Sequence, residues 1–342
     1  TPSHLTVEEI SEIIQNLKKF TSIENLSEFS MEIDPRVVEP KNFEKYASMG
    51  IDRISFGVQD FDPIVQKKIN REQPFELIES LMNNNLNKYF KGVNFDLLYG
   101  LPASSQETFS RTIELTKQLS PERITLIKYG HIPKKVKHMK MIKEEDLPDE
   151  NELPVIFVDS TKKLIEAGYD WVGIDHFAKK TDQLSIAKQK GEVYRNFGGE
   201  TPGYTKDMIS LGPTSTSGFG NYYFQNTYDL KEYRQDVNEG RFPVRRGYLL
   251  TRDDIIRREV NFSLQCNQVI KIDAINKKYN IEFKNYFKKE MDLLKKREDE
   301  GLLIITDKKI ESTIQGRYFI RHMCQIFDTF FDYSKEYEIH GN

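Results

Sequence analysis

The stretch Val93-Asn94-Phe95-Asp96-Leu97-Leu98-Tyr99-Gly100 is an apolar run that carries a carboxylate near its end and stops at a glycine. Three further runs share this layout, and a helical pattern precedes or follows each. This alternation is typical of a parallel β/α fold, in which the active site lies at the carboxyl ends of the strands. We therefore expect the polar residues of the four runs to lie close together at one edge of the sheet. The alternative is that they are merely solvent-exposed strand ends. The other runs are residues 29–34, 54–60 and 124–130, with Glu32, Gln59 and the Tyr129 segment at their ends.

The composition is that of an ordinary soluble protein, with 342 residues, 38% apolar and 30% charged, and a net charge of −3. This charge gives no reason to expect nucleic acid or an anionic membrane as a partner. No apolar run approaches the roughly 20 residues needed to cross a bilayer, so we expect no membrane insertion. The two cysteines, Cys266 and Cys324, form no C-x-x-C motif. We expect buried free thiols and a reducing, cytoplasmic location.

Local signals predict several element boundaries. Capping boxes are expected at Thr6–Glu9 and at residues 104–107, each opening a helix, and residues 250–254 are expected to cap a further helix. Residues 169–174 predict a further strand, followed by Asp175-His176. Residues 194–220 are glycine-rich and are expected to form loops, while the lysine-rich segment 133–143 is interpreted as solvated surface.

The character of the chain changes after about residue 230. Helical patterns there are followed by a hairpin-like pair at 302–305 and 309–311 and by a final helix expected over 316–331. We therefore predict two domains, 1–235 and 236–342, the second helical and winged-helix-like.

Seven motifs, in order along the chain, resemble one family: the oxygen-independent coproporphyrinogen III oxidases, radical S-adenosylmethionine (SAM) enzymes of haem biosynthesis. Asn70-Arg71-Glu72, Asp175-His176-Phe177-Ala178 and Thr251-Arg252-Asp253-Asp254 favour this family over the related haem-chaperone branch. The resemblance implies an incomplete (β/α)₆ barrel of the radical SAM type followed by a mainly helical domain. The seven motifs are SMEIDPR at 30–36, FGVQDF at 56–61, NRE at 70–72, DLLYGLP at 96–102, DHFA at 175–178, YRNF at 194–197 and LTRDD at 250–254.

The resemblance also implies residue roles. Glu32 would hold the ribose of a first SAM, and Gln59, Arg71 and Asp96 would contact a second, where Thr1 would also lie. Gly130 and Thr216 occupy positions of further contacts to the first SAM. Arg195 is the candidate cation for a propionate of coproporphyrinogen III, although an ordinary salt bridge is the alternative.

The family's reaction converts two propionates of the substrate into vinyl groups, giving protoporphyrinogen IX. It implies an electron donor and an electron acceptor, neither identified by the sequence, and a monomer when intact.

A [4Fe–4S] cluster needs cysteine thiolates, and radical SAM enzymes normally supply three in a C-x-x-x-C-x-x-C motif. This motif is absent from the 342 residues. We expect no metal ligands here, an unpaired edge strand, and an inactive fragment of a longer enzyme. The alternatives are a cluster-less relative that binds SAM, porphyrin or haem, a metal or hydrolytic site at His131 and His176, and a nucleic-acid-binding protein, which the charge disfavours.

Overall fold

The computed structural model describes residues 1–203 and 207–331. Its chain forms two compact units. The first comprises residues 1–171 and 175–182, and the second comprises Val172–Ile174 and the described residues between 183 and 331. The predicted division at residue 235 stays a prediction, whereas the contacts assign the described residues from Gln183 to 331 to the second unit.

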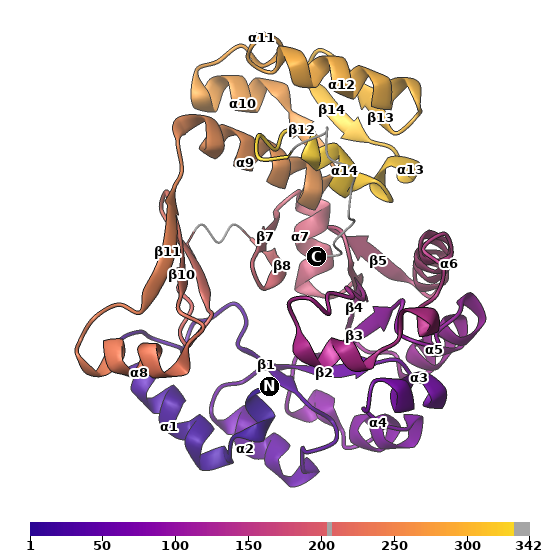
Figure 1. Cartoon of the computed structure of the whole chain (residues 1–342), viewed down its shortest axis with the longest axis vertical. Coiled ribbons are helices and arrows are strands. Elements are labelled where there is room, and N and C mark those ends of the chain that lie inside the picture. Colours follow the sequence, from indigo (N-terminus) through magenta and orange to yellow (C-terminus); the bar gives the residue numbers. More distant parts are fainter. Residues whose placement is uncertain (204–206, 332–342) are drawn as a thin grey trace. The chain divides into compact units, whose positions relative to one another are not determined.

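The first unit alternates strands and helices along the chain (Figure 1). Its strands are β1 (Ser30–Ile33), β2 (Arg53–Gln59), β3 (Gly92–Tyr99), β4 (Arg123–Lys128), β5 (Tyr169–Val172) and β6 (His176–Lys179). Its α-helices are α1 (Val7–Lys18), α2 (Phe43–Ser48), α3 (Pro63–Lys68), α4 (Phe75–Met82), α5 (Gln106–Leu119) and α6 (Glu152–Glu166). Short 3₁₀ turns are η1 (Pro2–His4), η2 (Pro40–Asn42), η3 (Leu86–Lys88), η4 (Lys137–Met141) and η5 (Glu144–Asp146).

The six strands form one sheet in the order β1-β2-β3-β4-β6-β5. The first four are parallel, as the repeated strand–helix rhythm predicted. β6 then pairs antiparallel with β4, with Ile124 opposite Phe177. The predicted strand at 169–174 is thus β5, and the neighbour of β4 is the strand that follows it, which the sequence did not reveal.

Residues alternate between two faces of the parallel strands. On one face, Phe56 and Phe95 are fully buried, and Tyr99 of β3 packs against Phe109 of α5. On the opposite face, Ser55 and Asp96 are only partly buried. The face away from the helices is therefore polar, which is the arrangement expected of a binding surface.

Helix starts follow the predicted capping chemistry, with one correction. Capping boxes join Thr6 to Glu9, as predicted, and Thr251 to Asp254, where a helix cap was predicted. The prediction for 104–107 was one residue early, because the box joins Ser105 to Thr108. Threonine can replace glutamate there since its hydroxyl accepts from the Ser105 backbone N–H at 2.9 Å.

The second unit combines helices with small antiparallel sheets (Figure 1). Its strands form the sheets β11-β10-β9 and β12-β14-β13 and the hairpin β7-β8. The strands are β7 (Val193–Asn196), β8 (Gly199–Pro202), β9 (Thr216–Phe219), β10 (Tyr222–Asn226), β11 (Val244–Leu249), β12 (Val269–Lys271), β13 (Leu303–Ile305) and β14 (Lys309–Ser312). The helices are α7 (Gln183–Lys190), α8 (Leu230–Asn238), α9 (Arg252–Asn267), α10 (Ile272–Tyr279), α11 (Phe283–Tyr286), α12 (Lys288–Asp299), α13 (Ile314–Arg317) and α14 (Ile320–Gln325).

Two sequence predictions for this unit were wrong. The segment 194–220 contains three strands rather than loops alone, because Phe197 and Gly198 form the turn of a hairpin and Gly199, at φ +115°, begins its second strand. The expected helix 316–331 is split into α13 and α14. Thr313 caps α13 through the Gly316 N–H, and a Cβ at Gly316 would lie 1.9 Å from the Leu302 carbonyl oxygen. The predicted hairpin at 302–311 is confirmed as β13 and β14.

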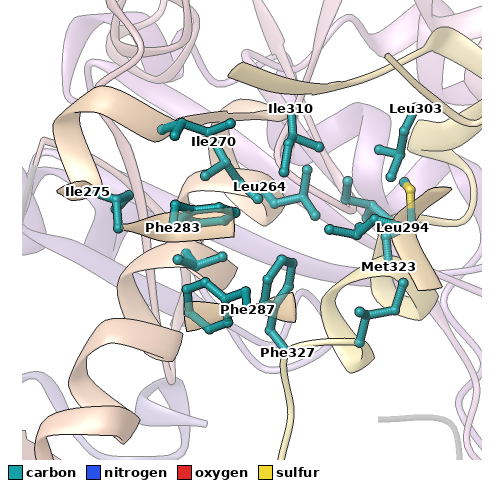
Figure 2. Close-up of a cluster of buried hydrophobic side chains, with 14 of the residues drawn as sticks. Leu264, Ile270, Ile275, Phe283, Phe287, Leu294, Leu303, Ile310, Met323 and Phe327 are labelled. Atoms are coloured by element: carbon teal, nitrogen blue, oxygen red, sulfur yellow. The ribbon is translucent and has the colours of Figure 1, made fainter. Parts of the chain in front are cut away.

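The core of the second unit joins its helices and its small sheet. Figure 2 shows Phe283, Phe287 and Phe327 packed together beneath Leu264 and Ile310. Phe287 and Phe327 meet edge to face, with ring centroids 5.3 Å apart. Among the described residues, no helix has both the length and the apolar character needed to cross a bilayer.

Candidate functional site

The carboxyl ends of β1 to β4 lie at one edge of the sheet, because these strands are parallel. Glu32 of β1 pairs in register with Ser55 of β2, and Gly57 of β2 pairs with Asp96 of β3. Glu32 and Asp96 therefore share the polar face. We call Glu32, Gln59, Arg71 and Asp96 the strand-end site.

Asp96 is held in place by neighbouring strand residues. The Ser55 hydroxyl donates to Asp96 Oδ2 at 2.7 Å, and Asn94 Nδ2 donates to Oδ1 at 2.8 Å. Thr125 of β4 donates in turn to Asn94 Oδ1 at 3.3 Å. The carboxylate is thus fixed in orientation while its side of the sheet stays open. The sequence pointed to Asp96 but not to Ser55 and Asn94. Both lie at strand positions that alternate with buried apolar residues, and this pattern could have placed them on the polar face.

Gln59 occupies a distorted strand end. Its φ is +66°, and the β2–β3 register shifts between Gly57 and Gln59. A Cβ at Gly57 would lie 2.8 Å from Gln59 Nε2 and 3.1 Å from Arg71 Nη2. The ends of both side chains therefore lie over Gly57, beside the Asp96 position, and only glycine leaves room for them.

Arg71 joins this group from the loop after α3. Its Nη2 donates to the Gly57 carbonyl at 3.0 Å, and its Nη1 lies 3.4 Å from Asp34 Oδ2. Burial lowers the pKa of Arg71, and Asp34 opposes that effect. The Arg71 Nε is buried and has no hydrogen-bond partner among the described residues. One donor of Arg71 is thus left unsatisfied by the described chain.

Asp34, which directly follows β1, connects several parts of this edge. Arg36 forms a fork with both of its carboxylate oxygens, at 3.0 and 2.7 Å. These hydrogen bonds lower the pKa of Asp34 to about 2, so the carboxylate stays ionised. The Asp34 N–H donates to Ser3 Oγ at 2.9 Å, which anchors the segment containing Thr1 at the end of β1.

The remaining predicted contact of this unit, Gly130, follows β4 at the same edge. The N–H of the preceding Tyr129 donates to the Tyr99 carbonyl at 2.8 Å and prolongs the β3–β4 pairing. The Tyr129 hydroxyl lies 3.2 Å from His131 Nδ1, while His176 Nδ1 lies 2.7 Å from Asp175 Oδ1. Each histidine thus has a neighbouring partner of its own.

At the opposite end of the strands, two arginines form a buried ion network that the sequence did not suggest. Arg53 contacts Asp182 at 2.7 Å and Glu28 at 3.1 Å. Arg123 contacts the same two acids, each at 2.8 Å. This network fills the amino-terminal end of the polar face with paired side chains.

Thr216 and Arg195 lie in the second unit. Thr216 begins β9, and Gln225 of β10 lies opposite it. Arg195 Nη1 lies 2.6 Å from both carboxylate oxygens of Glu200 on the paired strand β8. Arg195 also lines a cavity of about 350 Å³, together with the aromatic residues Tyr194, Phe197, Tyr223 and Phe262.

Cys266 and Cys324 alone cannot supply the three thiolates of a radical SAM cluster. Cys266 is fully buried in the second unit, and burial raises the pKa of its thiol. Burial also raises the pKa of Cys324 to about 12. Radical SAM enzymes normally supply three cysteines to the cluster, and this chain has two. Both cysteines are free, as expected, and Cys266 is buried, whereas Cys324 is only partly buried.

Comparisons with known proteins agree with the two-part architecture. Residues 1–116 match the model of the radical SAM superfamily, and residues 250–319 match that of the HemN C-terminal domain. The oxygen-independent coproporphyrinogen III oxidase of Salmonella typhimurium (strain LT2) is 36% identical over 330 residues, covering 96% of this chain and 72% of the relative. The enzyme of the same name from Helicobacter pylori (strain ATCC 700392 / 26695) is 37% identical over 331 residues, with the same coverage.

A solved structure shows the same fold. Coproporphyrinogen III oxidase (HemN) from Escherichia coli, described as a radical SAM enzyme, superposes with a TM-score of 0.93 at 36% identity. The match covers 97% of this chain and 76% of that chain. The sequence-based recognition is therefore confirmed, and the chain belongs to the oxygen-independent coproporphyrinogen III oxidase family of radical SAM enzymes.

Proposed function

We propose that the strand-end site binds SAM and that the protein serves the oxygen-independent oxidative decarboxylation of coproporphyrinogen III to protoporphyrinogen IX. The observation that carries this proposal is the meeting of Gln59 and Arg71 over Gly57, beside Asp96, in a chain of this family. The family's chemistry uses SAM and a [4Fe–4S] cluster.

The residues of the strand-end site fit the polar groups of SAM. Carboxylates accept from hydroxyl and ammonium donors, so Glu32 suits a ribose and Asp96 suits a donor of a second SAM. Arg71 Nε is a buried donor without a partner in the described chain, and guanidinium groups pair well with carboxylates. Two SAM molecules are proposed: one contacted by Glu32, Gly130 and Thr216, the other by Thr1, Gln59, Arg71 and Asp96.

The cluster does not fit the cysteines of this chain. Cys266 and Cys324 are two thiols instead of three, and they form no C-x-x-x-C-x-x-C motif. We therefore derive from this chain's own residues only the binding and orientation of SAM. Reconstitution of this polypeptide with iron and sulfide is expected to give no cluster whose EPR signal shifts on adding SAM, and such a shift would contradict this.

The substrate, coproporphyrinogen III, carries propionates that require cations. Arg195 is the proposed contact, and its pairing with Glu200 means that a propionate must compete with a carboxylate already in place. We also propose that the reaction uses an electron donor and an electron acceptor, and that the protein is a monomer.

A second candidate function is favoured by the cysteines alone. A cluster-less relative would bind SAM, porphyrin or haem without radical chemistry. It predicts the same SAM binding and, in addition, no turnover of coproporphyrinogen III by the native protein isolated from its source.

Calorimetric titration of SAM into the purified chain tests the proposed site. Wild-type protein is expected to bind SAM saturably, and Glu32→Gln is expected to weaken binding about tenfold by removing one charged acceptor. Glu8→Gln makes the same chemical change on the exposed face of α1 and serves as the matched control. Equal binding by Glu32→Gln and Glu8→Gln would refute the role of Glu32, and no SAM binding by wild type would refute the function.

A further inference from the structure

We propose that Gln73, locked by Gln66, is a positioning residue that holds the backbone of Gln59 in its left-handed conformation and so places the Gln59 and Arg71 side chains for SAM. This inference rests on the proposed function of the strand-end site. Both glutamines are almost completely buried, at 1% and 3% exposure, and neither belongs to the predicted site.

The end of β2 is strained where Gln59 lies. The Asp60 N–H donates to the Val58 carbonyl at 2.9 Å, across a central residue with φ +66°. A hydrogen bond between residues i and i+2 with a positive central φ is the pattern of the rare, strained form of γ-turn. Such a conformation persists only when surrounding contacts over-determine it.

Gln73 supplies those contacts on one side. Its Nε2 donates to the Gly57 carbonyl at 3.0 Å and also makes a short hydrogen bond to the Val58 carbonyl. The Gly57 carbonyl is also the acceptor for Arg71 Nη2, at 3.0 Å. One side chain thus fixes the two peptide groups before Gln59 and shares an acceptor with Arg71.

Gln66 of α3 fixes Gln73 and the peptide between Asp60 and Phe61, directly after the turn. Its Oε1 accepts from the Gln73 N–H at 2.9 Å. Its Nε2 donates to the Gln73 carbonyl at 2.8 Å and to the Asp60 carbonyl at 2.9 Å. The Gln66 carbonyl accepts from the Arg71 N–H at 2.9 Å, so the same segment also sets the path of the Arg71 backbone.

Loss of the Gln73 donors would release this turn. Residue 59 is free to relax to an extended conformation once the Gly57 and Val58 carbonyls lose the amide. Such a change of φ turns the Cα–Cβ bond of residue 59 relative to the preceding peptide, so the Gln59 side-chain amide leaves its position over Gly57. Gln73 therefore acts through Gln59 and Arg71 and need not touch the ligand.

The test uses Gln73→Met, which keeps the length of the side chain and removes both donors. SAM affinity measured by calorimetry is expected to fall at least tenfold. Arg71→Lys is expected to cost less affinity in the Gln73→Met background than in wild type, since Arg71 is already misplaced there. Leu164→Ala, at a fully buried position of α6 in the same unit, is the control for general destabilisation and is expected to leave SAM affinity within twofold of wild type.

A second measurement is independent of SAM. Hydrogen exchange is expected to be at least tenfold faster in Gln73→Met than in wild type for the amides of Asp60 and Arg71, with the amides of β3 unchanged. The positioning role is overturned if wild type binds SAM and Gln73→Met has the same SAM affinity and the same amide exchange rates as wild type. Absence of SAM binding by wild type would instead refute the proposed function, and the exchange data would still decide the role of Gln73.

Discussion

Asp60 is a buried carboxyl group whose ionisation should oppose folding of the first unit. It is fully buried behind the end of β2. Oδ1 accepts from the Thr112 hydroxyl at 2.5 Å and from the Asp62 N–H at 2.9 Å, while Oδ2 has no partner among the described residues. Burial raises the pKa of Asp60 from 3.8 to about 6, against the lowering effect of the Thr112 hydrogen bond.

The sign of the effect on stability follows from the two protonation states. Between pH 3.8 and about 6 the folded chain binds more protons at Asp60 than the unfolded chain does, so the free energy of unfolding falls as the pH rises. At about 1.4 kcal/mol for each pH unit, the full loss is about 3 kcal/mol, of which about 2 kcal/mol falls between pH 4 and pH 7.5.

Asp60→Asn removes the charge and keeps the shape and the Oδ1 acceptor. The free energy of unfolding of the variant minus that of wild type should therefore rise by about 2 kcal/mol between pH 4 and pH 7.5. Taking this difference cancels the titration of every other group, and any constant cost of burying the amide.

Urea denaturation followed by tryptophan fluorescence measures this difference. Trp171, the single tryptophan, is 2% exposed and stacks on Phe177 with centroids 6.2 Å apart, so it reports on the first unit. If the two stability curves run parallel across this pH range, within about 0.5 kcal/mol, Asp60 is not perturbed and the reasoning is refuted.

Three further predictions concern the same unit. Gly57→Ala should weaken SAM binding at least tenfold, because its Cβ would lie 2.8 Å from Gln59 Nε2; unchanged affinity in a titration would show that the two side chains do not need this space. Asp34→Asn should remove the part of the acid-induced stability loss that Asp34 contributes as the pH falls from 3.8 through about 2, since Arg36 lowers the pKa of Asp34; an unchanged acid-denaturation midpoint would argue against it. Arg53→Ala should destabilise the unit by about 3–5 kcal/mol, because Glu28 and Asp182 are then left to share Arg123 and one of their two negative charges is uncompensated; Lys91→Ala, which breaks an exposed pair with Asp52, should cost at most about 1 kcal/mol, and equal costs in urea denaturation would contradict the buried network.

Much of the first unit follows from local sequence patterns. The apolar alternation places Phe56 and Phe95 on one face and Asp96 on the other, and short-range capping places the start of α1, as it does that of α9 in the second unit. These features depend on residues a few positions apart. They are therefore visible without knowledge of the fold.

The features that the sequence did not reveal depend on contacts between distant residues. Arg53 and Asp182 are separated by 129 positions, and nothing in either local sequence indicates their pairing. The turn at Gln59 carries no glycine at its strained position and is held by Gln73 from another segment. The break between α13 and α14 reflects the close approach of Gly316 to Leu302 of a preceding loop.

Co-crystallisation of the chain with SAM tests the central claim most directly. The account predicts a SAM molecule at the carboxyl ends of β2 and β3, with its carboxylate or another acceptor within hydrogen-bond distance of Arg71 Nε and a donor facing Asp96. A SAM molecule bound elsewhere, with Arg71 Nε still unpartnered and the strand-end site filled only by water, would contradict it.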